Sequence, residues 1–140
     1  MSTAHGDLNA RRDELSGQPE QLARERDYYA ALFRLAPEAC VVSDSSGTIR
    51  DVNDAGQRLL RLSRPFLVGR PIQLFVAPEH RSEFRTRLNE LLSQEPETAK
   101  SWQGALRRND PLAAQFTANA VPSAEGVVRV CWVLRPNQPG

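Results

Sequence analysis

Apolar residues follow a helical spacing in the first part of the 140-residue chain. They predict an amphipathic helix over residues 18–36, with Pro19 in its first turn. The apolar stripe of this helix consists of Leu22, Tyr29, Leu32 and Phe33. Residues 1–17 are polar, and we expect them to be disordered or loosely helical. We expect one folded domain over residues 37–136 and a short tail over 137–140.

Two short runs rich in β-branched residues flank a polar turn within residues 40–53. We expect the turn to end at Gly47, because this position needs a positive φ and glycine adopts one without steric cost. This pattern predicts a β-hairpin with a four-residue loop. Asn53 follows the second run and is a good N-cap for a helix over residues 54–60. The turn also accounts for three nearby serines, Ser43, Ser45 and Ser46.

The second half of the chain combines helical and strand patterns. Ser63 is placed to cap a short helical turn. Apolar residues at helical spacing then predict a longer amphipathic helix over residues 79–92. Strict alternation of apolar and polar residues follows in three segments, residues 102–107, 112–120 and 127–135. Such alternation predicts antiparallel strands with one buried face.

The composition excludes several classes of function. The formal net charge of +1, with 18 basic and 17 acidic residues, argues against a nucleic-acid partner. No apolar run is long enough to span a membrane and no signal peptide is recognisable, so we expect a cytoplasmic protein. The two cysteines, Cys40 and Cys131, lie in strand-like runs and are expected to be small buried hydrophobes. With only two histidines, we expect no metal site.

Three motifs in this order resemble the PAS family of sensory modules. The run from Ser43 to Asn53 resembles the family's opening, a strand, an Asp-x-x-Gly turn, a strand and a helix-starting Asn. Residues 62–70 resemble the segment Leu-Gly-Tyr-Ser-x-x-Glu-Leu-x-Gly-Lys in its second half, and residues 78–81 resemble the start of the long PAS helix. The resemblance covers roughly residues 30–136. It implies an α+β fold, a five-stranded antiparallel sheet with helices on one face and an N-terminal flanking helix.

The chain departs from the family pattern at two places. The turn at residues 109–111 reads Asn-Asp-Pro and is one residue shorter than the usual Asp-Gly turn. The last strand ends at Pro136, where the family often has Asp-Ile-Thr leading into an output helix. We therefore expect the effector either on sequence outside this chain or on a separate signalling protein.

The residues do not assemble into a recognisable catalytic set. The carboxylates of Asp51, Asp54 and Glu79 suit helix caps and surface positions, and no glycine-rich phosphate loop is present. We therefore expect no enzymatic activity.

The resemblance also bears on cofactors. Flavin-binding members have a reactive cysteine where this chain has Ile72, and haem-binding members have a histidine ligand where it has Phe84. A phenyl ring has no nitrogen to donate to iron. His80 precedes that position by one turn and is expected to be a surface or capping residue. We expect no cofactor.

An apolar interior is expected between the sheet and the helix of residues 79–92. Its candidate lining residues are Phe75, Phe84, Leu88, Trp102, Leu106, Phe116, Ala118, Val130, Trp132 and Leu134. The small alanines leave room for an apolar ligand, whereas Trp102 and Trp132 are large enough to fill the same space. Both alternatives stay open from the sequence.

These observations favour a sensory or protein-interaction module of a bacterial-type signal-transduction or transcription-regulatory protein. We expect a homodimer that uses Leu22, Tyr29, Leu32 and Phe33 as contacts. The other interpretation of this stripe is that it packs on its own domain. The alternative is a sensor that holds a small organic molecule or haem in the apolar interior.

Overall fold

The computed structural model describes residues 6–93, 99–122, 126 and 128–137. The chain divides into two compact units, Met1–Phe33 and Arg34–Gly140. Of the segments expected from the sequence, residues 1–5 and most of the tail lie outside the described residues. Among the described residues, no helix combines the length and hydrophobicity needed to cross a bilayer.

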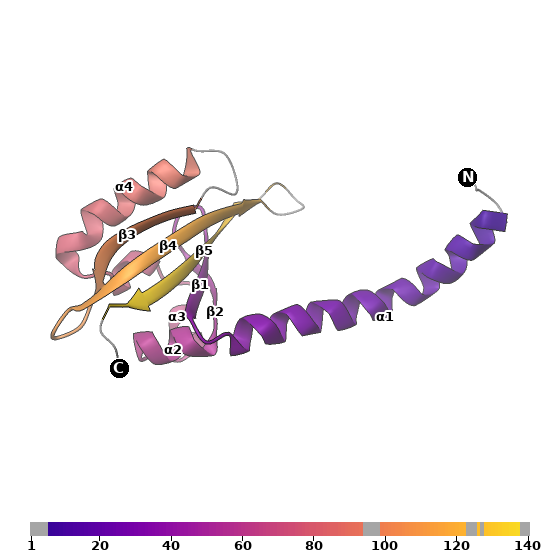
Figure 1. Ribbon diagram of the computed structural model, residues 1–140, viewed down its shortest axis with the longest axis horizontal. Coiled ribbons are helices and arrows are strands. Elements are labelled where there is room, and N and C mark those ends of the chain that lie inside the picture. The colour runs from indigo at the N-terminus through magenta and orange to yellow at the C-terminus, as the bar shows by residue number, and fades with distance from the viewer. Residues whose placement is uncertain (1–5, 94–98, 123–125, 127, 138–140) are drawn as a thin grey trace. The chain divides into compact units, whose positions relative to one another are not determined.

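The N-terminal helix α1 spans Gly6–Leu35 and is longer than the sequence predicted (Figure 1). Residues 6–17, which the sequence analysis expected to be disordered or loosely helical, belong to this helix. Pro19 lies inside the helix, not in its first turn. Proline inside a helix removes one backbone hydrogen bond and crowds the carbonyl four residues earlier, so Pro19 weakens α1 at this point.

The second unit contains a five-stranded antiparallel sheet in the order β2-β1-β5-β4-β3. The strands are β1 (Ala39–Asp44), β2 (Ile49–Val52), β3 (Ala99–Leu106), β4 (Leu112–Pro122) and β5 (Val128–Pro136). The predicted hairpin and the three later strands are therefore confirmed. The first and last strands of the unit are neighbours, because β5 inserts between β1 and β4.

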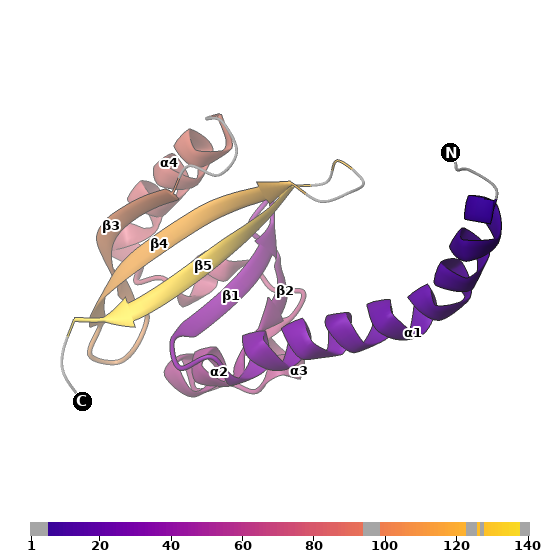
Figure 2. The same ribbon diagram turned by 45° about the vertical axis from the view of Figure 1, so that its right-hand side comes forward.

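Helices and helical turns contribute their buried residues to one face of the sheet. They are α2 (Asp54–Leu60), α3 (Arg64–Leu67), the 3-10 turns η1 (Ile72–Phe75) and η2 (Pro78–His80), and α4 (Arg81–Leu92). Buried side chains of these helices join those of the strands in a single apolar core. In Figure 2 the strands lie in front and α4 is seen behind β3. The predicted α+β architecture is confirmed.

The hairpin turn between β1 and β2 is organised by the carboxylate of Asp44. Its Oδ1 atom accepts hydrogen bonds from the Ser46 and Thr48 backbone N–H groups at 3.0 and 2.9 Å, and from the Ser46 hydroxyl at 2.7 Å. Gly47 follows with φ of +92°, the positive value that the sequence predicted. Partial burial acts to raise the pKa of Asp44, but the hydrogen bonds from Ser46 and Thr48 and the charge of Arg50 outweigh it and hold the pKa below its usual range.

Asn53 connects the start of β1 to the start of α2. Its side-chain Oδ1 accepts hydrogen bonds from the backbone N–H groups of Gly56 and Cys40, both at 2.9 Å. Its Nδ2 donates to the carbonyl of Glu38 at 2.8 Å. Asn53 is fully buried, so these partners replace the water that the amide lacks. The predicted N-cap is confirmed, and it also binds a strand.

The glycine at position 56 allows this close approach of helix and strand. A Cβ atom at Gly56 would lie 2.7 Å from Cγ2 of Val52 and 3.2 Å from the carbonyl oxygen of Cys40. Such distances are shorter than van der Waals contact allows, so a larger residue would push α2 away from β1.

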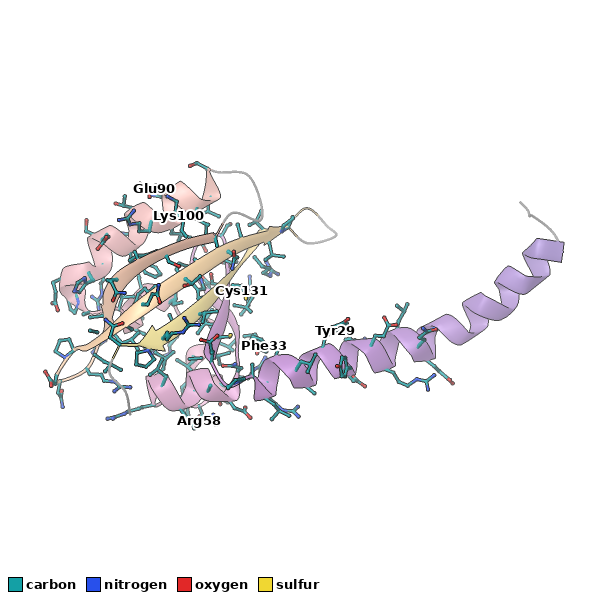
Figure 3. The ribbon with its side chains drawn as sticks, in the orientation of Figure 1. Tyr29, Phe33, Arg58, Glu90, Lys100 and Cys131 are labelled. Atoms are coloured by element: carbon teal, nitrogen blue, oxygen red, sulfur yellow. The ribbon has the colours of Figure 1, made fainter. Side chains whose placement is uncertain are left out.

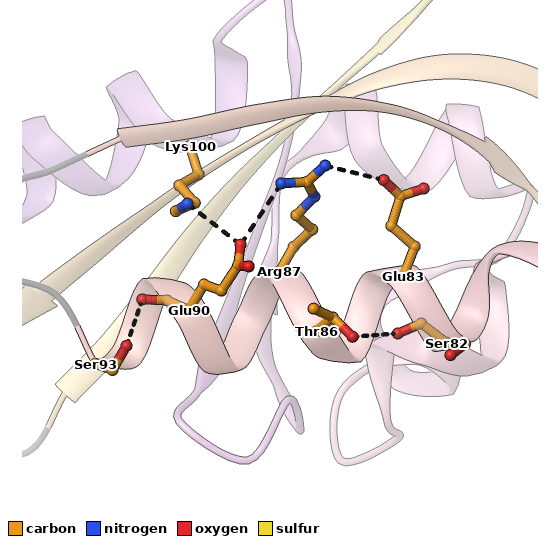
Figure 4. A network of polar contacts seen from close by, with 7 residues as sticks. All are labelled: Ser82, Glu83, Thr86, Arg87, Glu90, Ser93 and Lys100. Carbon is orange, nitrogen blue, oxygen red and sulfur yellow. Dashed lines mark hydrogen bonds and ion pairs between the residues drawn. The ribbon is translucent and has the colours of Figure 1, made fainter.

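A network of polar side chains on α4 connects this helix to β3 (Figure 4). Glu90 lies 3.3 Å from the Lys100 ammonium of β3 and 3.5 Å from the Arg87 guanidinium one turn earlier. Arg87 also pairs with Glu83 at 3.2 Å. These contacts are partly exposed, so they orient the helix and contribute little to stability.

We predict that Asn53→Ala lowers the free energy of unfolding by about 3 kcal/mol, because it leaves two N–H groups and one carbonyl without their partners. Urea unfolding followed by circular dichroism measures this change. Asn89→Ala, on the exposed surface of α4, is the matched control and should change stability by less than about 0.5 kcal/mol. Equal effects of the two variants would contradict the role given to Asn53.

Candidate functional site

The apolar interior of the second unit is the first candidate site. The structure brings together all ten residues predicted to line it: nine are buried members of the core, and Phe75 packs against them half-buried. Their side chains come from η1, α4 and strands β3, β4 and β5. The sequence therefore predicted which residues gather here.

Four aromatic rings occupy this interior. Phe84 of α4 stacks on Trp132 of β5, with ring centroids 4.8 Å apart and an interplanar angle of 18°. Trp102 meets both of these rings edge-on, at 6.3 and 6.0 Å. Phe116 approaches Phe84 at 6.2 Å and Trp102 at 5.8 Å. Stacked and edge-on contacts at these distances are favourable, so the rings stabilise one another as well as excluding water.

A buried hydroxyl satisfies the indole N–H of Trp132 in this ring cluster. The indole Nε1–H of Trp132 donates to Oγ of Ser43 at 2.8 Å, and the Ser43 hydroxyl donates to the carbonyl of Asp44 at 2.9 Å. The sequence analysis assigned Ser43 to the turn, and this was wrong: it is a fully buried residue of β1. Alternation with Ala39 and Val41 was the signal that placed it on the inner face.

The free space beside these rings is small. A void of about 10 Å³ lies among side chains that include Phe75, Ile72 and Phe84. This volume is at the lower limit for a single water molecule. Ile72 and Phe84, which stand where the resemblance places a flavin-reactive thiol and a haem ligand, both border it. A ligand of several heavy atoms would enter only if the rings moved.

The second candidate site is the apolar stripe of α1, which includes Tyr29 and Phe33 in Figure 3. Leu22, Tyr29 and Leu32 are 60%, 65% and 50% exposed, and Phe33 is half-buried. The sequence analysis missed two further exposed apolar residues of this helix, Tyr28 and Leu35. Their spacing from Leu32 was the signal that could have included them.

The two cysteines lie on the face of the sheet opposite the core. Cys40 and Cys131 alternate with the buried residues of β1 and β5 and are half-buried free thiols. Figure 3 labels Cys131. The sequence predicted small buried hydrophobes, and the structure places them less deeply. Burial raises the pKa of both thiols, and for Cys40 the neighbouring Cys131 and Glu38 raise it further. Protonated thiols are weak nucleophiles, so the pair has little reactivity at neutral pH.

The remaining predicted residues are arranged without a catalytic or metal-binding cluster in the described part of the chain. Asp51 pairs with Arg64 at 2.8 Å on the surface, and Asp54 lies in the first turn of α2. His80 and Glu79 lie in η2, at the start of α4. Within the described residues, no three His, Cys, Asp or Glu side chains gather as a metal site requires.

Comparisons with known proteins agree with this architecture. A family model described as the PAS fold matches residues 27–136, and the chain therefore belongs to the PAS family. No protein with a curated description matches it.

Solved structures show the same fold at low sequence identity. The PAS domain of an HTR-like protein from Haloarcula marismortui is 21% identical, covers 86% of this chain and 98% of its own, and has a TM-score of 0.72. A PAS domain from a two-component sensor histidine kinase is 15% identical, with coverages of 82% and 98% and a TM-score of 0.68. The PAS domain of a LuxR-family transcriptional regulator from Burkholderia thailandensis, in complex with ethanol, is 21% identical, with coverages of 78% and 96% and a TM-score of 0.59.

We predict that Phe84→Ala lowers the free energy of unfolding by about 3–5 kcal/mol, because the cavity that it leaves is lined by the other three rings. Phe66→Ala is the matched control, because Phe66 is exposed, and it should cost less than about 1 kcal/mol. Thermal or urea unfolding of both variants measures the difference. A similar small loss in both would show that the ring cluster does not support the fold.

Proposed function

We propose that this chain is a sensory signalling module that pairs two copies of itself through α1 and has no enzymatic activity. The family match supports a sensory role, since PAS domains are generally sensory, non-catalytic modules. The observation that carries the pairing is the exposed apolar stripe of α1. We place its action in the cytoplasm of a bacterial-type cell, on an effector domain or a separate signalling protein.

The stripe is large enough to support pairing. Full burial of one leucine or aromatic side chain contributes about 1.5–3 kcal/mol. Two copies of the helix together would bury eight such side chains, the predicted contacts Leu22, Tyr29, Leu32 and Phe33 from each. Association of two molecules costs about 4–15 kcal/mol of free energy, mainly through lost translational and rotational freedom. The summed contribution of these side chains is larger than the lower estimates of that cost.

The connection between α1 and the sheet supports a route for the signal. Helix α1 ends at Leu35 and β1 begins at Ala39, so only three residues separate them. A change in the second unit would therefore reach the helix pair through a short connection. Helix shifts at subunit interfaces are a common form of such switching.

The second candidate function is the sensing of a small apolar molecule in the interior. The ethanol complex of the Burkholderia thailandensis PAS domain favours it, because a molecule of that size binds a related fold. The void of about 10 Å³ would have to enlarge, and the rings that border it, Phe75, Phe84 and Phe116, would have to move apart. Haem is disfavoured, because the phenyl ring of Phe84 supplies no ligand atom.

We predict that the double substitution Leu22→Glu and Tyr29→Glu weakens self-association by about 100-fold or more, because two apolar contacts per copy are replaced by charges. Sedimentation velocity over a range of concentrations measures the change.

The matched control is Ala23→Glu with Ala30→Glu, which adds the same charge at two positions of α1 that are also seven residues apart but lie away from the stripe. It should leave the dimer intact. A monomeric wild-type chain, or an unchanged sedimentation coefficient in the stripe variant, would contradict the proposed pairing.

A further inference from the structure

A hollow with an apolar floor and a basic rim lies at one end of the sheet, beside α2. It has a volume of about 470 Å³. Its floor includes Ala39, Ala55, Leu59 and Leu134. Four arginines line it: Arg58 (labelled in Figure 3), Arg61, Arg108 and Arg135. A second hollow of about 490 Å³ shares Arg61 and Arg108 and continues along residues 109–113.

Arg61 has a backbone conformation that a side-chain-bearing residue rarely adopts. It ends α2 with φ of 60° and ψ of 33°, the left-handed region, and is the only described residue other than glycine with a positive φ. Glycine or asparagine usually occupies this position at a helix end. An arginine here is less stable than glycine would be, because its Cβ atom is crowded in the left-handed region.

Arg108 is held in place from the opposite side of the hollow. Its guanidinium donates a hydrogen bond to the carbonyl of Leu59, near the C-terminal end of α2. Partial burial lowers the pKa of Arg108, and the nearby positive charge of Arg61 lowers it further. Two like charges are thus kept near each other, an arrangement that an anion between them would stabilise.

Two carboxylates lie near these arginines, Glu38 in the lining of this hollow and Asp110 in the lining of the adjoining one. Glu38, which also lines it, is engaged by Arg135, whose Nε lies 2.6 Å from the Glu38 Oε2 atom. In the described part of the chain, Arg58, Arg61 and Arg108 form no ion pair with an acidic side chain. The rim therefore carries three guanidinium groups without an acidic partner in the described part of the chain, and one of them, Arg108, is bonded to the carbonyl of Leu59.

We propose that this hollow binds a small organic anion, with a carboxylate or phosphate head on Arg61, Arg58 and Arg108 and a short apolar body on Leu59 and Leu134. Guanidinium groups bind these two heads through paired charge-assisted hydrogen bonds. The volume lies within the range of small-molecule sites, about 300–1,000 Å³. This proposal is independent of the pairing of α1, since every residue of the hollow belongs to the second unit.

Pro37 and Glu38 connect the hollow to the segment that leads from α1 into β1. Both line it, and both belong to the three-residue segment between α1 and β1. A bound anion would compete with Glu38 for Arg135 and would contact that segment directly. The hollow is therefore placed to convert ligand binding into a change at the base of the N-terminal helix.

The test is a titration of the full chain, followed by ¹H–¹⁵N correlation NMR, with octanoate, octyl phosphate and the neutral 1-octanol. We expect saturable shifts of the backbone amides of residues 58–61 and 108 with at least one of the two anions, and none with 1-octanol. Arg61→Gly should weaken binding by about three- to tenfold, because it removes one charge-assisted contact. Its thermal midpoint should be equal or higher, because glycine suits the left-handed backbone.

Arg70→Ala is the matched control, because it removes the same charge from an exposed position outside the hollow. It should leave the affinity unchanged. Arg58→Gln, on the exposed last turn of α2, should weaken binding as Arg61→Gly does. If Arg61→Gly fails to fold, the affinity of the Arg58→Gln variant tests the proposal instead. Absence of saturable shifts with both anions, equal binding of 1-octanol, or equal weakening by Arg70→Ala would overturn the proposal.

Discussion

The side-chain amide of Asn53 is the interaction on which the rest of the second unit depends. One buried group accepts from the N–H groups of Cys40 and Gly56 and donates to the carbonyl of Glu38. It therefore sets the end of the α1–β1 connection, the start of β1 and the first turn of α2 together. Because β5 pairs with β1, the same constraint positions Trp132, and through it the stacked ring of Phe84. Removal of the amide would loosen all of these at once.

The ring cluster decides where a signal could act. The void beside Phe84 and Phe116 has a volume of only about 10 Å³. The hollow beside α2 has about 470 Å³ and three guanidinium groups without an acidic partner among the described residues. A close-packed interior resists small changes, while a surface hollow admits a ligand without repacking the core. We therefore propose that the ligand binds on the outside of the unit, next to the segment that leads to α1. The response to binding would be a change in the pairing of that helix.

Local rules predicted most of this fold, and contacts between distant residues explain what they missed. The hairpin, the cap at Asn53 and the alternation in the later strands depend on neighbours in sequence, and all three were predicted. The roles of Ser43 and Arg61 were not predicted: one accepts from Trp132, 89 residues away, and the other adopts a left-handed backbone that its residue type disfavours. The lining of the interior was predicted by alternation, but its filling depends on how four rings pack, which no pattern encodes.

Native mass spectrometry of the purified chain tests the central claim most directly, because it reports subunit number and bound cofactor together. The account predicts a mass of two chains, each of 15.6 kDa, without haem or flavin. A dimer of this mass would show that the chain pairs without a prosthetic group in its core. A monomer at micromolar concentration, or one haem or flavin per chain, would contradict the account, because the first removes the pairing and the second requires an interior that the rings of Phe84 and Trp132 do not leave open.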